Sequence, residues 1–444
     1  IGAFFHNQKQ EPGLAVEKNE KGEYNLLDHL AKSNGEPVVM LAASGGGTRA
    51  ALYTASVLRG LSSLGQLDRL VLASGVSGGS AALAYYAIHR PNASDPAAWK
   101  KMMDTLSYPF IDDVLAGAAE HRIVSNSRLG HLLSESFKRC FLGTSPAEAA
   151  KQRVTFKGNN DIGLIFNTTL CGAPSARAGA FHKQSKQSAG GRLVVTNLTS
   201  NFDRKTIFYE NQWHPDIAFE VIRSSNAKLY EAASLSANFP PVFSNAAVEV
   251  GGIPPYWVTD GGAVENRGVI SILLALAETF NSIIDHNLTV DLPDIRIVVA
   301  DASAFDPEYI SDRGMGAKLG ASEQLANRLI RELFNRVRLQ HKRMTHRDDG
   351  IKFLYLPMPD AMRAKGTFGT HWMMPDTITI KNPFNGEEGD EIEKGDLKEL
   401  MVSMFSKEYS EEYVQGKWPD NRELAGIIWE ETKHLRNELN SFFN

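Results

Sequence analysis

Short apolar runs alternate with segments of helical periodicity in the first part of the chain, and glycines mark the junctions between them. The runs 37-PVVMLAAS-44 and 69-RLVLASGVS-77 are short, apolar and bounded by turn residues, which is typical of buried strands. Each is followed by apolar positions at helical spacing, first from Thr48 to about Leu64 and then over 78-GGSAALAYYAIHR-90. Strand, glycine turn and helix, repeated once, predict an α/β layer with a parallel sheet.

The same patterns predict further elements along the rest of the chain. Strands are expected at 162-IGLIFNTTL-170, 192-RLVVTNLT-199, Trp257–Thr259 and 295-IRIVVADAS-303. Helices are expected at 26–31, 227–237, 269–284 and about 317–345, and again at the end of the chain. The helix at 227–237 should stop before 239-FPPVF-243, because proline cannot continue a helix. Residues 375–395 are acidic and contain glycines, and we predict a loop there.

A chain of 444 residues exceeds the usual size of a single core, so one large domain and two domains are both compatible with its length. No internal repeat or low-complexity linker divides it, which favours one catalytic α/β domain with helical insertions. We predict an N-terminal arm at 1–36, a core at 37–301 and a helical extension at 302–444 that completes the same domain. Within the core, residues 91–155 are expected to form a helical insertion or lid.

Composition limits the partners and the compartment. The chain is 43% hydrophobic and 22% charged, with a net charge of −5, so its electrostatics give no reason to expect nucleic acid. No run of 18 apolar residues occurs, which argues against a membrane-spanning helix and favours a cytoplasmic or peripheral membrane location. Cys140 and Cys171 lack the spacing of a zinc site and favour a reducing compartment. The chain starts at Ile1, so we expect processing of a longer protein, and an upstream membrane anchor is compatible with that start.

The second glycine turn carries a candidate nucleophile. Gly75-Val76-Ser77-Gly78-Gly79 fits the pattern G-x-S-x-G at the junction of a predicted strand and a predicted helix. This is the context of a nucleophile elbow, and the positive end of the following helix would favour a developing alkoxide on Ser77. The pentapeptide alone is also compatible with an ordinary turn.

The first glycine turn offers backbone N–H groups to an anion. Three consecutive glycines, Gly45, Gly46 and Gly47, stand at a helix start, which suits an oxyanion or a phosphate. No lysine follows them as a Walker loop would require, and Ala50 stands where a dinucleotide motif needs its last glycine. A nucleotide site is therefore disfavoured. A plain tight turn would not explain three glycines followed by Arg49.

A serine nucleophile needs a general base, and the sequence leaves several candidates. Asp260-Gly261-Gly262 follows a short apolar run, although D-G-G alone is usually a turn. A Ser-His-Asp triad of the α/β-hydrolase type would need a later histidine. The candidates, none of which lies in a telling context, are His341, His346, His371 and His434. The glycine turn also precedes the serine by a single strand–helix unit and lacks the histidine of an H-G-G-G loop.

Taken together, SGGGTRA, GVSGGS and DGG resemble the patatin-like and cytosolic phospholipase A2-like lipid acyl hydrolases. These proteins have a G-G-G-x-R loop, a G-x-S-x-G serine and a D-G-G or D-G-A aspartate in this order. The strand with FNTT and the segment ASLSANFPPVF are also similar to parts of that family. The resemblance covers roughly Pro37 to Asp301. It implies a three-layer α/β sandwich with a mainly parallel central sheet and helical insertions.

The resemblance also implies roles for individual residues. Ser77 would be the nucleophile and Asp260 its direct base, in a dyad without histidine, while Asp301 also ends a strand and is an alternative base. Gly45, Gly46 and Gly47 would donate N–H groups to an oxyanion. Arg49 would stabilise that region or hold a lipid phosphate, and Gly78 would help to bind substrate. No metal or cofactor is required for this chemistry.

The sequence thus predicts a serine lipid acyl hydrolase of the phospholipase A or lysophospholipase type, which acts through an acyl-enzyme at a membrane surface. The insertion at 91–155 and the basic face of the helix at 317–345 are candidates for a lid or a headgroup-facing surface, although a solvated helix packed on the domain fits equally. Two alternatives stay open: an α/β-hydrolase-type esterase with a triad, and a non-catalytic lipid- or nucleotide-binding module. Nothing in the sequence identifies a protein partner.

Overall fold

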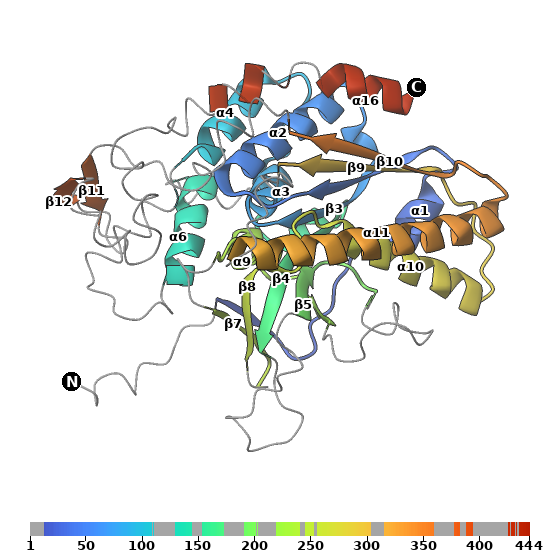
Figure 1. The fold of residues 1–444 in the computed structure, drawn as a ribbon, viewed down its shortest axis with the longest axis horizontal. Coiled ribbons are helices and arrows are strands. Elements are labelled where there is room, and N and C mark those ends of the chain that lie inside the picture. Colours follow the sequence, from blue (N-terminus) through green and yellow to red (C-terminus); the bar gives the residue numbers. More distant parts are fainter. Residues whose placement is uncertain are drawn as a thin grey trace.

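A large sheet with helices on both faces forms the centre of the molecule (Figure 1). The structure is a computed structural model. It describes residues 13–108, 110, 129–143, 153–172, 191–200, 202, 219–239, 245–252, 255–302, 315–358, 377–381, 388–393, 425–426, 428–430, 432 and 435–444.

Ten strands of the described residues form the main sheet. They are β1 (Leu14–Val16), β2 (Val38–Ala43), β3 (Leu70–Val76), β4 (Gly163–Gly172), β5 (Gly191–Thr196), β6 (Phe219–Arg223), β7 (Ala246–Val250), β8 (Tyr256–Asp260), β9 (Ile295–Asp301) and β10 (Ile351–Pro357). Their order is β1-β7-β8-β4-β3-β2-β9-β10, and β5 and β6 continue the sheet from β4. The pairings from β4 through β3, β2 and β9 to β10 are parallel, whereas β4 is antiparallel to both β5 and β8.

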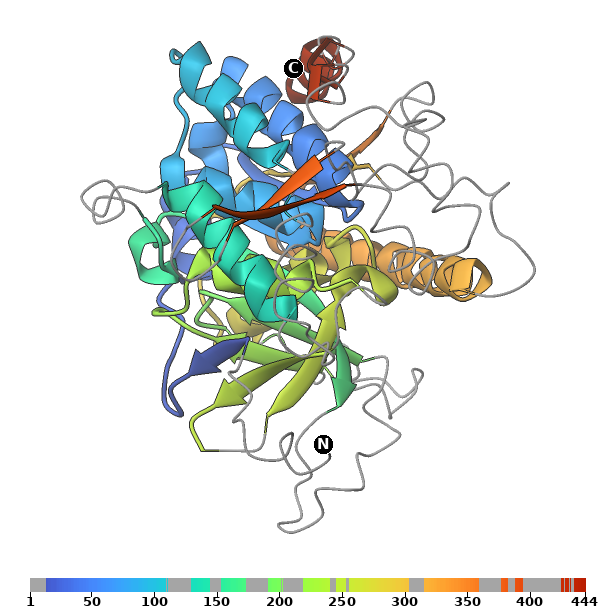
Figure 2. The same cartoon turned by 90° about the vertical axis from the view of Figure 1, so that its left-hand side faces the viewer.

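Two hydrophobic cores, one on each face of the sheet, make the fold a three-layer sandwich (Figures 1 and 2). Helices α2 (Gly47–Ser63), α3 (Gly78–His89), α4 (Pro96–Leu106), α6 (Leu129–Leu142), α9 (Leu229–Ser236) and α16 (Leu435–Phe443) belong to one core. Helices α1 (Leu26–Lys32), α10 (Val269–Asp285) and α11 (Met315–Thr345) belong to the other. Successive side chains of β2 point to opposite faces of the sheet, so Val39 and Leu41 lie in the first core and Val38 and Met40 in the second. Because both faces of this strand are buried, its sequence is apolar throughout.

The structure confirms the three-layer α/β fold and most of the predicted elements. Between residues 37 and 90, both strands and both helices lie within one residue of their expected bounds. The other predicted strands are also present and correspond to β4, β5, β8 and β9. The other predicted helices correspond to α1, α9, α10, α11 and α16. The segment 240–243 of the predicted proline stop lies outside the described residues.

Four strands of the main sheet were not predicted: β1, β6, β7 and β10. The loop predicted at 375–395 is wrong in part, because β11 (Thr377–Lys381) and β12 (Glu388–Glu393) pair antiparallel, with Ile378 opposite Ile392. Acidic and glycine-rich composition obscured a period of two in TITIK and in DEIE. The region after residue 302 is therefore not helical throughout. The division into arm, core and extension stays a prediction, although β1 and β10 both join the main sheet.

Helix α11 packs through one side against α10 and the second core, and its other side is mostly basic. Leu333 and Val337 are buried in the second core, whereas five basic side chains and the acidic Glu332 are exposed; the basic ones are those of Arg328, Arg331, Arg338, Lys342 and Arg343. The predicted amphipathic helix is thus confirmed, while its role at a membrane stays a prediction. No helix of the described residues combines the length and apolarity needed to cross a membrane.

We expect the inner face of α11 to contribute to global stability. Leu333 is 4% exposed and Leu339, on the same helix, is 55% exposed. Leu333→Ala should lower the free energy of unfolding by about 2–5 kcal/mol, because it removes buried methyl groups and leaves a cavity. Leu339→Ala should change it by less than about 0.5 kcal/mol. Guanidinium chloride unfolding measures both, and equal effects would contradict the burial of this face of α11 in the second core.

Candidate active site

Two strands run toward each other along one edge of β4 and stop at the same point. On this edge β3 pairs with the first half of β4, where Val76 lies opposite Asn167. The antiparallel strand β8 pairs with the second half, where Asp260 lies opposite Thr168. Strand β5 occupies the other edge of β4 along both halves. The residues at the carboxyl ends of β3 and β8 are therefore brought together although they are far apart in the sequence.

Ser77 occupies a sharp and strained turn between β3 and α3. Its φ of 49° and ψ of −121° lie outside the regions that a side chain normally allows, as expected for a nucleophile elbow. A Cβ at Gly78 would collide with the carbonyl oxygen of Gly47, and a Cβ at Gly79 would lie 2.6 Å from that of Ala43. The two glycines thus allow the elbow to pack directly on the first glycine turn.

Asp260 ends β8 with a buried carboxylate that is only half satisfied. Its side chain is 2% exposed, and Oδ1 accepts a hydrogen bond of 2.7 Å from the N–H of Gly262. Oδ2 is buried without a hydrogen-bond partner of normal geometry among the described residues. Burial raises the pKa of Asp260 to about 6, against smaller lowering effects from the Gly262 N–H and the nearby Ser77 hydroxyl. The Ser77 hydroxyl thus lies close enough to influence the carboxylate, as in many unliganded sites whose hydrogen bonds are still long.

The first glycine turn lies beside Ser77 and presents free backbone donors. A Cβ at Gly45 would be 3.2 Å from that of Ser77, and Gly46 and Gly47 have φ values of 134° and 59°. The N–H of Gly45 already donates to the carbonyl oxygen of Asn266 at 2.8 Å. For the N–H groups of Gly46, Gly47 and Gly78, no acceptor is present among the described residues, as is normal at helix starts. These three N–H groups, rather than that of Gly45, can receive an anion.

Arg49 is buried in the first turns of α2, with a side chain 2% exposed. A Cβ added at Gly46 would lie 3.4 Å from its Nη2 atom, so the guanidinium turns back toward the glycine turn. This position puts a positive charge behind the backbone donors. At 2% exposure, Arg49 is less suited to hold a lipid headgroup at the surface.

The alternative base Asp301 is engaged elsewhere. Its carboxylate accepts hydrogen bonds from Nε of Arg267, at 2.8 Å, and from the hydroxyl of Tyr355. An ion pair with arginine stabilises the ionised carboxylate and makes it a poor proton acceptor.

The two candidate histidines that the structure describes lie away from Ser77. Nε2 of His341 is 2.9 Å from the carbonyl oxygen of Pro293, which precedes β9, and burial lowers the pKa of this imidazole. The site is at the other end of β9, roughly 20 Å along a strand of this length. His346 is exposed beyond the end of α11. His371 and His434 lie outside the described residues.

Three residues that support the site were missed in the sequence. Ser236 is fully buried on α9, where its Oγ accepts the N–H of Ser77 at 2.9 Å. Asn167 donates to Oγ of Ser74 and to the carbonyl oxygen of Gly75 and so ties β4 to the end of β3. The side chain of Asn266 lies between Gly45 and Gly262. Ser236 and Asn167 stand in segments that the sequence analysis singled out, ASLSAN and FNTT, and Asn266 follows DGG by four residues, but nothing in the sequence says which side chain points inward.

Among the described residues, no group of three or more His, Cys, Asp or Glu side chains is arranged to hold a metal ion.

Comparison with known proteins relates this chain to a protein family. A model of the patatin-like phospholipase family matches residues 41–273, from β2 to α10, and this range includes both glycine turns and Asp260. No curated protein sequence matches the chain significantly.

Several solved structures are similar to the chain at low identity. Human GIVD cytosolic phospholipase A2 is 11% identical with a TM-score of 0.41, over 94% of this chain and 63% of that one. VipD from Legionella pneumophila is 8% identical with a TM-score of 0.23, over 92% of this chain and 86% of that one. The complex of SpcU and ExoU from the type III secretion system of Pseudomonas aeruginosa matches at 17% identity with a TM-score of 0.22, over 68% of this chain and 53% of that one. The chain therefore spans less than two thirds of the length of the human protein.

The family model covers more than half of the chain and includes the candidate nucleophile, the candidate base and both glycine turns. The chain belongs to the patatin-like phospholipase family.

Proposed function

We propose that this chain is a serine lipid acyl hydrolase of the phospholipase A or lysophospholipase type, with Ser77 as nucleophile and Asp260 as its direct base. One observation carries the proposal: the strained serine at the end of β3 lies beside a buried carboxylate that has one free oxygen. The carboxylate has a pKa of about 6, so it is ionised at neutral pH and is still more basic than an ordinary aspartate.

In the first step, Oγ of Ser77 attacks the acyl carbonyl carbon of the lipid ester while its proton passes to Oδ2 of Asp260. The tetrahedral intermediate then collapses, the bond between the carbonyl carbon and the leaving oxygen breaks, and Asp260 returns the proton to that oxygen. This releases an alcohol, such as a lysophospholipid, and leaves the fatty acyl group on Ser77. Gly262 holds Oδ1 throughout, so the carboxylate keeps its orientation.

The negative charge of the tetrahedral intermediate needs donors that are already in place. The N–H groups of Gly46, Gly47 and Gly78 suit this role because they are free, adjacent to Ser77 and located at the positive ends of α2 and α3. Arg49 adds a buried positive charge behind the loop. Gly45 has a different part in this proposal: its N–H fixes the loop to Asn266.

In the second step, Asp260 removes a proton from water, and the resulting hydroxide attacks the acyl carbon of the acyl-enzyme. The bond to Oγ breaks, the proton returns to Ser77, and the fatty acid leaves. Ser77 is 5% exposed, so both steps take place largely out of contact with bulk water. In such a shielded site the fixed N–H donors stabilise negative charge more strongly than they would in water.

We expect Ser77→Ala and Asp260→Asn each to lower kcat/KM for fatty acid release from phosphatidylcholine and lysophosphatidylcholine by at least about 10³-fold, because each removes a reacting group. A fluorophosphonate probe should label the wild type and fail to label Ser77→Ala. His346→Ala is the matched control and should stay within about twofold of wild type, since this histidine is exposed and outside the site.

The two alternatives give different results in the same assays. A triad enzyme would lose activity in one alanine variant of His341, His346, His371 or His434, and would keep it in Asp260→Asn. A non-catalytic module would show no probe labelling, or labelling that survives Ser77→Ala.

The base should also set the pH profile. Because Asp260 must be ionised to accept a proton, kcat/KM should fall about tenfold per pH unit below a pKa near 6 and reach a plateau above it. The rate of fluorophosphonate labelling of Ser77 should follow the same curve. A profile that stays flat between pH 5 and 8 would show that another group takes the proton.

A carboxylate whose folded pKa is raised should destabilise the fold at neutral pH. The folded protein then binds more protons than the unfolded chain between about pH 4 and 6, so stability falls as pH rises through this range. Asp260→Asn should therefore raise the free energy of unfolding at pH 8 by about 1–3 kcal/mol, at about 1.4 kcal/mol per pKa unit. The gain should vanish below about pH 4, where the Asp260 carboxyl group is protonated in both the folded and the unfolded protein.

Urea unfolding at pH 8 and at pH 3.5 checks this difference. Asp104→Asn is the matched control, because this aspartate is 63% exposed on α4 and should give less than about 0.5 kcal/mol at either pH. If Asp260→Asn were less stable than the wild type at pH 8, the buried, ionised carboxylate of Asp260 would not destabilise the fold as we expect.

A further inference from the structure

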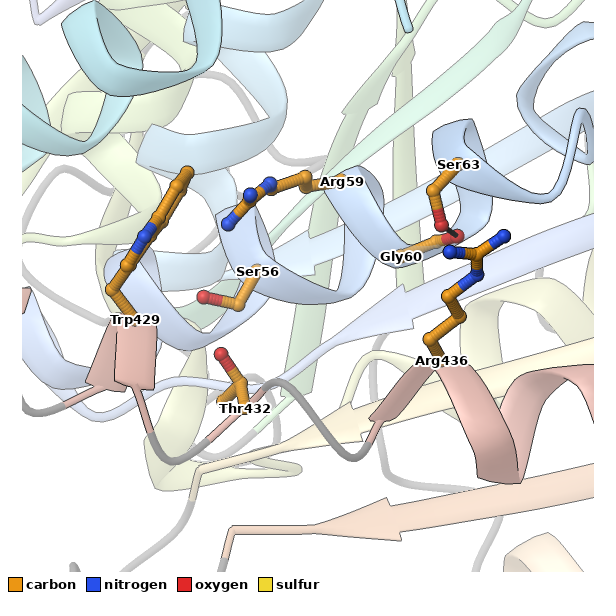
Figure 3. A pocket seen from close by; sticks show the side chains of 7 residues that line it. All are labelled: Ser56, Arg59, Gly60, Ser63, Trp429, Thr432 and Arg436. Atoms are coloured by element: carbon orange, nitrogen blue, oxygen red, sulfur yellow. Dashed lines mark hydrogen bonds between the residues drawn. The ribbon is translucent and has the colours of Figure 1, made fainter. Parts of the chain in front are cut away.

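A small pocket with two arginines lies between α2 and the C-terminal part of the chain (Figure 3). It has a volume of about 180 Å³. The side chains that define its chemistry come from both segments: Ser56, Arg59 and Ser63 from α2, and Trp429, Thr432 and Arg436 from the C-terminal part. The two segments are also joined near Gly60, where an added Cβ would lie 2.7 Å from Leu439 of α16.

The pocket is separate from the candidate active site. Helix α2 begins with Gly47 in the first glycine turn, and the pocket uses the opposite half of this helix. At a rise of about 1.5 Å per residue, Arg59 lies roughly 18 Å along the helix from Gly47. None of the pocket's lining residues contributes to the site around Ser77 and Asp260.

Within the described part of the chain, no ion pair neutralises the positive charge of the pocket. Neither Arg59 nor Arg436 forms a salt bridge with a carboxylate of the described residues. The Arg59 guanidinium stacks on the ring of Trp429, 3.3 Å from its centroid, and this contact fixes its plane. Burial lowers the pKa of Arg59, and Glu430 partly opposes this effect from beyond ion-pair distance.

A buried hydroxyl in the pocket lacks a partner. Ser56 is 6% exposed, and its Oγ has no hydrogen-bond partner among the described residues. Thr432 is 9% exposed, and its hydroxyl already donates to the carbonyl oxygen of Ile428. An unsatisfied buried hydroxyl is costly for a protein unless something outside the chain accepts its proton. In Figure 3 the Ser56 hydroxyl lies between Arg59 and Thr432, so an acceptor in the pocket would reach it.

Charge, geometry and size together select the ligand. Guanidinium groups and a hydroxyl donor suit a tetrahedral oxyanion, which accepts several hydrogen bonds at once. The volume is small beside the roughly 300–1,000 Å³ of pockets for drug-sized ligands, which excludes an acyl chain but leaves room for one phosphate group. We propose that this pocket binds a phosphomonoester or inorganic phosphate through the Arg59 guanidinium and the Ser56 hydroxyl, which lie next to each other beside Trp429 (Figure 3).

The test measures binding to a protein that cannot turn over lipid. In the Ser77→Ala background, isothermal titration calorimetry with inorganic phosphate and with glycerol 3-phosphate should detect a single site at constant ionic strength. Arg59→Gln and Ser56→Ala should each weaken this binding by about tenfold, which is the usual effect of losing one charge-assisted or buried hydrogen bond. Because Ser56 lacks a partner, Ser56→Ala should leave the melting temperature of the free protein unchanged or higher.

Matched controls separate this pocket from general charge effects. Ser62 is also 6% exposed on α2 but does not line the pocket, and Arg331 is exposed on α11. Ser62→Ala and Arg331→Gln should bind both ligands as the parent protein does. Absence of saturable binding by either soluble ligand, or equal binding by the pocket variants and the controls, would overturn the proposal.

A second experiment identifies the source of the phosphate. Flotation with phosphatidylcholine vesicles, with and without phosphatidic acid, tests a lipid headgroup in the same Ser77→Ala background. Recruitment that needs phosphatidic acid, weakens in Arg59→Gln and Ser56→Ala, and is reversed by glycerol 3-phosphate assigns the pocket to a lipid. Soluble ligands that bind without such recruitment assign it to a free phosphate compound.

Discussion

The arrangement of β3 and β8 on one edge of β4 is the constraint on which the site depends. A strand has two edges, and β5 takes one of them, so β3 and β8 must share the other. They approach from opposite directions and end at Val76 and Asp260, which face the neighbouring residues Asn167 and Thr168. Both β3 and β8 therefore end at the same place beside β4, and Ser77, which follows β3, lies beside Asp260, the last residue of β8. Two residues 183 positions apart meet through backbone pairing alone, and the side chains need only refine the geometry.

Glycines convert this arrangement into a site, because they allow the two turns to touch through their backbones. With no side chain at Gly78 or Gly79, the start of α3 packs directly on the end of β2 and the first turn of α2. The starts of α2 and α3 then lie close together beside Ser77, where the first N–H groups of a helix have no partner within the helix. The buried hydroxyl of Ser236 holds the strained turn from behind by accepting the Ser77 N–H. Strain at Ser77 is thus supported by contacts that are remote in sequence.

Local patterns explain how much of this could be predicted from the sequence. Strands β2 and β3 are apolar on both faces and the helices after them are regular, so their bounds, Ser77 and the glycine turns were evident. Asp260 needed the resemblance to a family, because D-G-G is an ordinary turn by itself. Ser236 and Asn266 act through contacts that only the fold creates, and no local signal marks them. Strand β10 was missed for a related reason: its partner β9 lies about 50 residues earlier, and β10 is a partly exposed strand at the edge of the sheet, so its place depends on a pairing that no local pattern shows.

A base without histidine works only if burial tunes its basicity. An aspartate in water has a pKa near 4 and would be too weak a base for a serine hydroxyl, whereas an uncharged carboxyl could not accept the proton at all. The environment of Asp260 avoids both limits. Burial raises its pKa to about 6, while the Gly262 N–H and the Ser77 hydroxyl keep the pKa from rising further. The same feature leaves Oδ2 without a normal hydrogen bond, since any additional strong donor would lower the pKa and occupy the oxygen that must receive the proton. The unsatisfied atom in the free protein is therefore a requirement of the reaction that we propose.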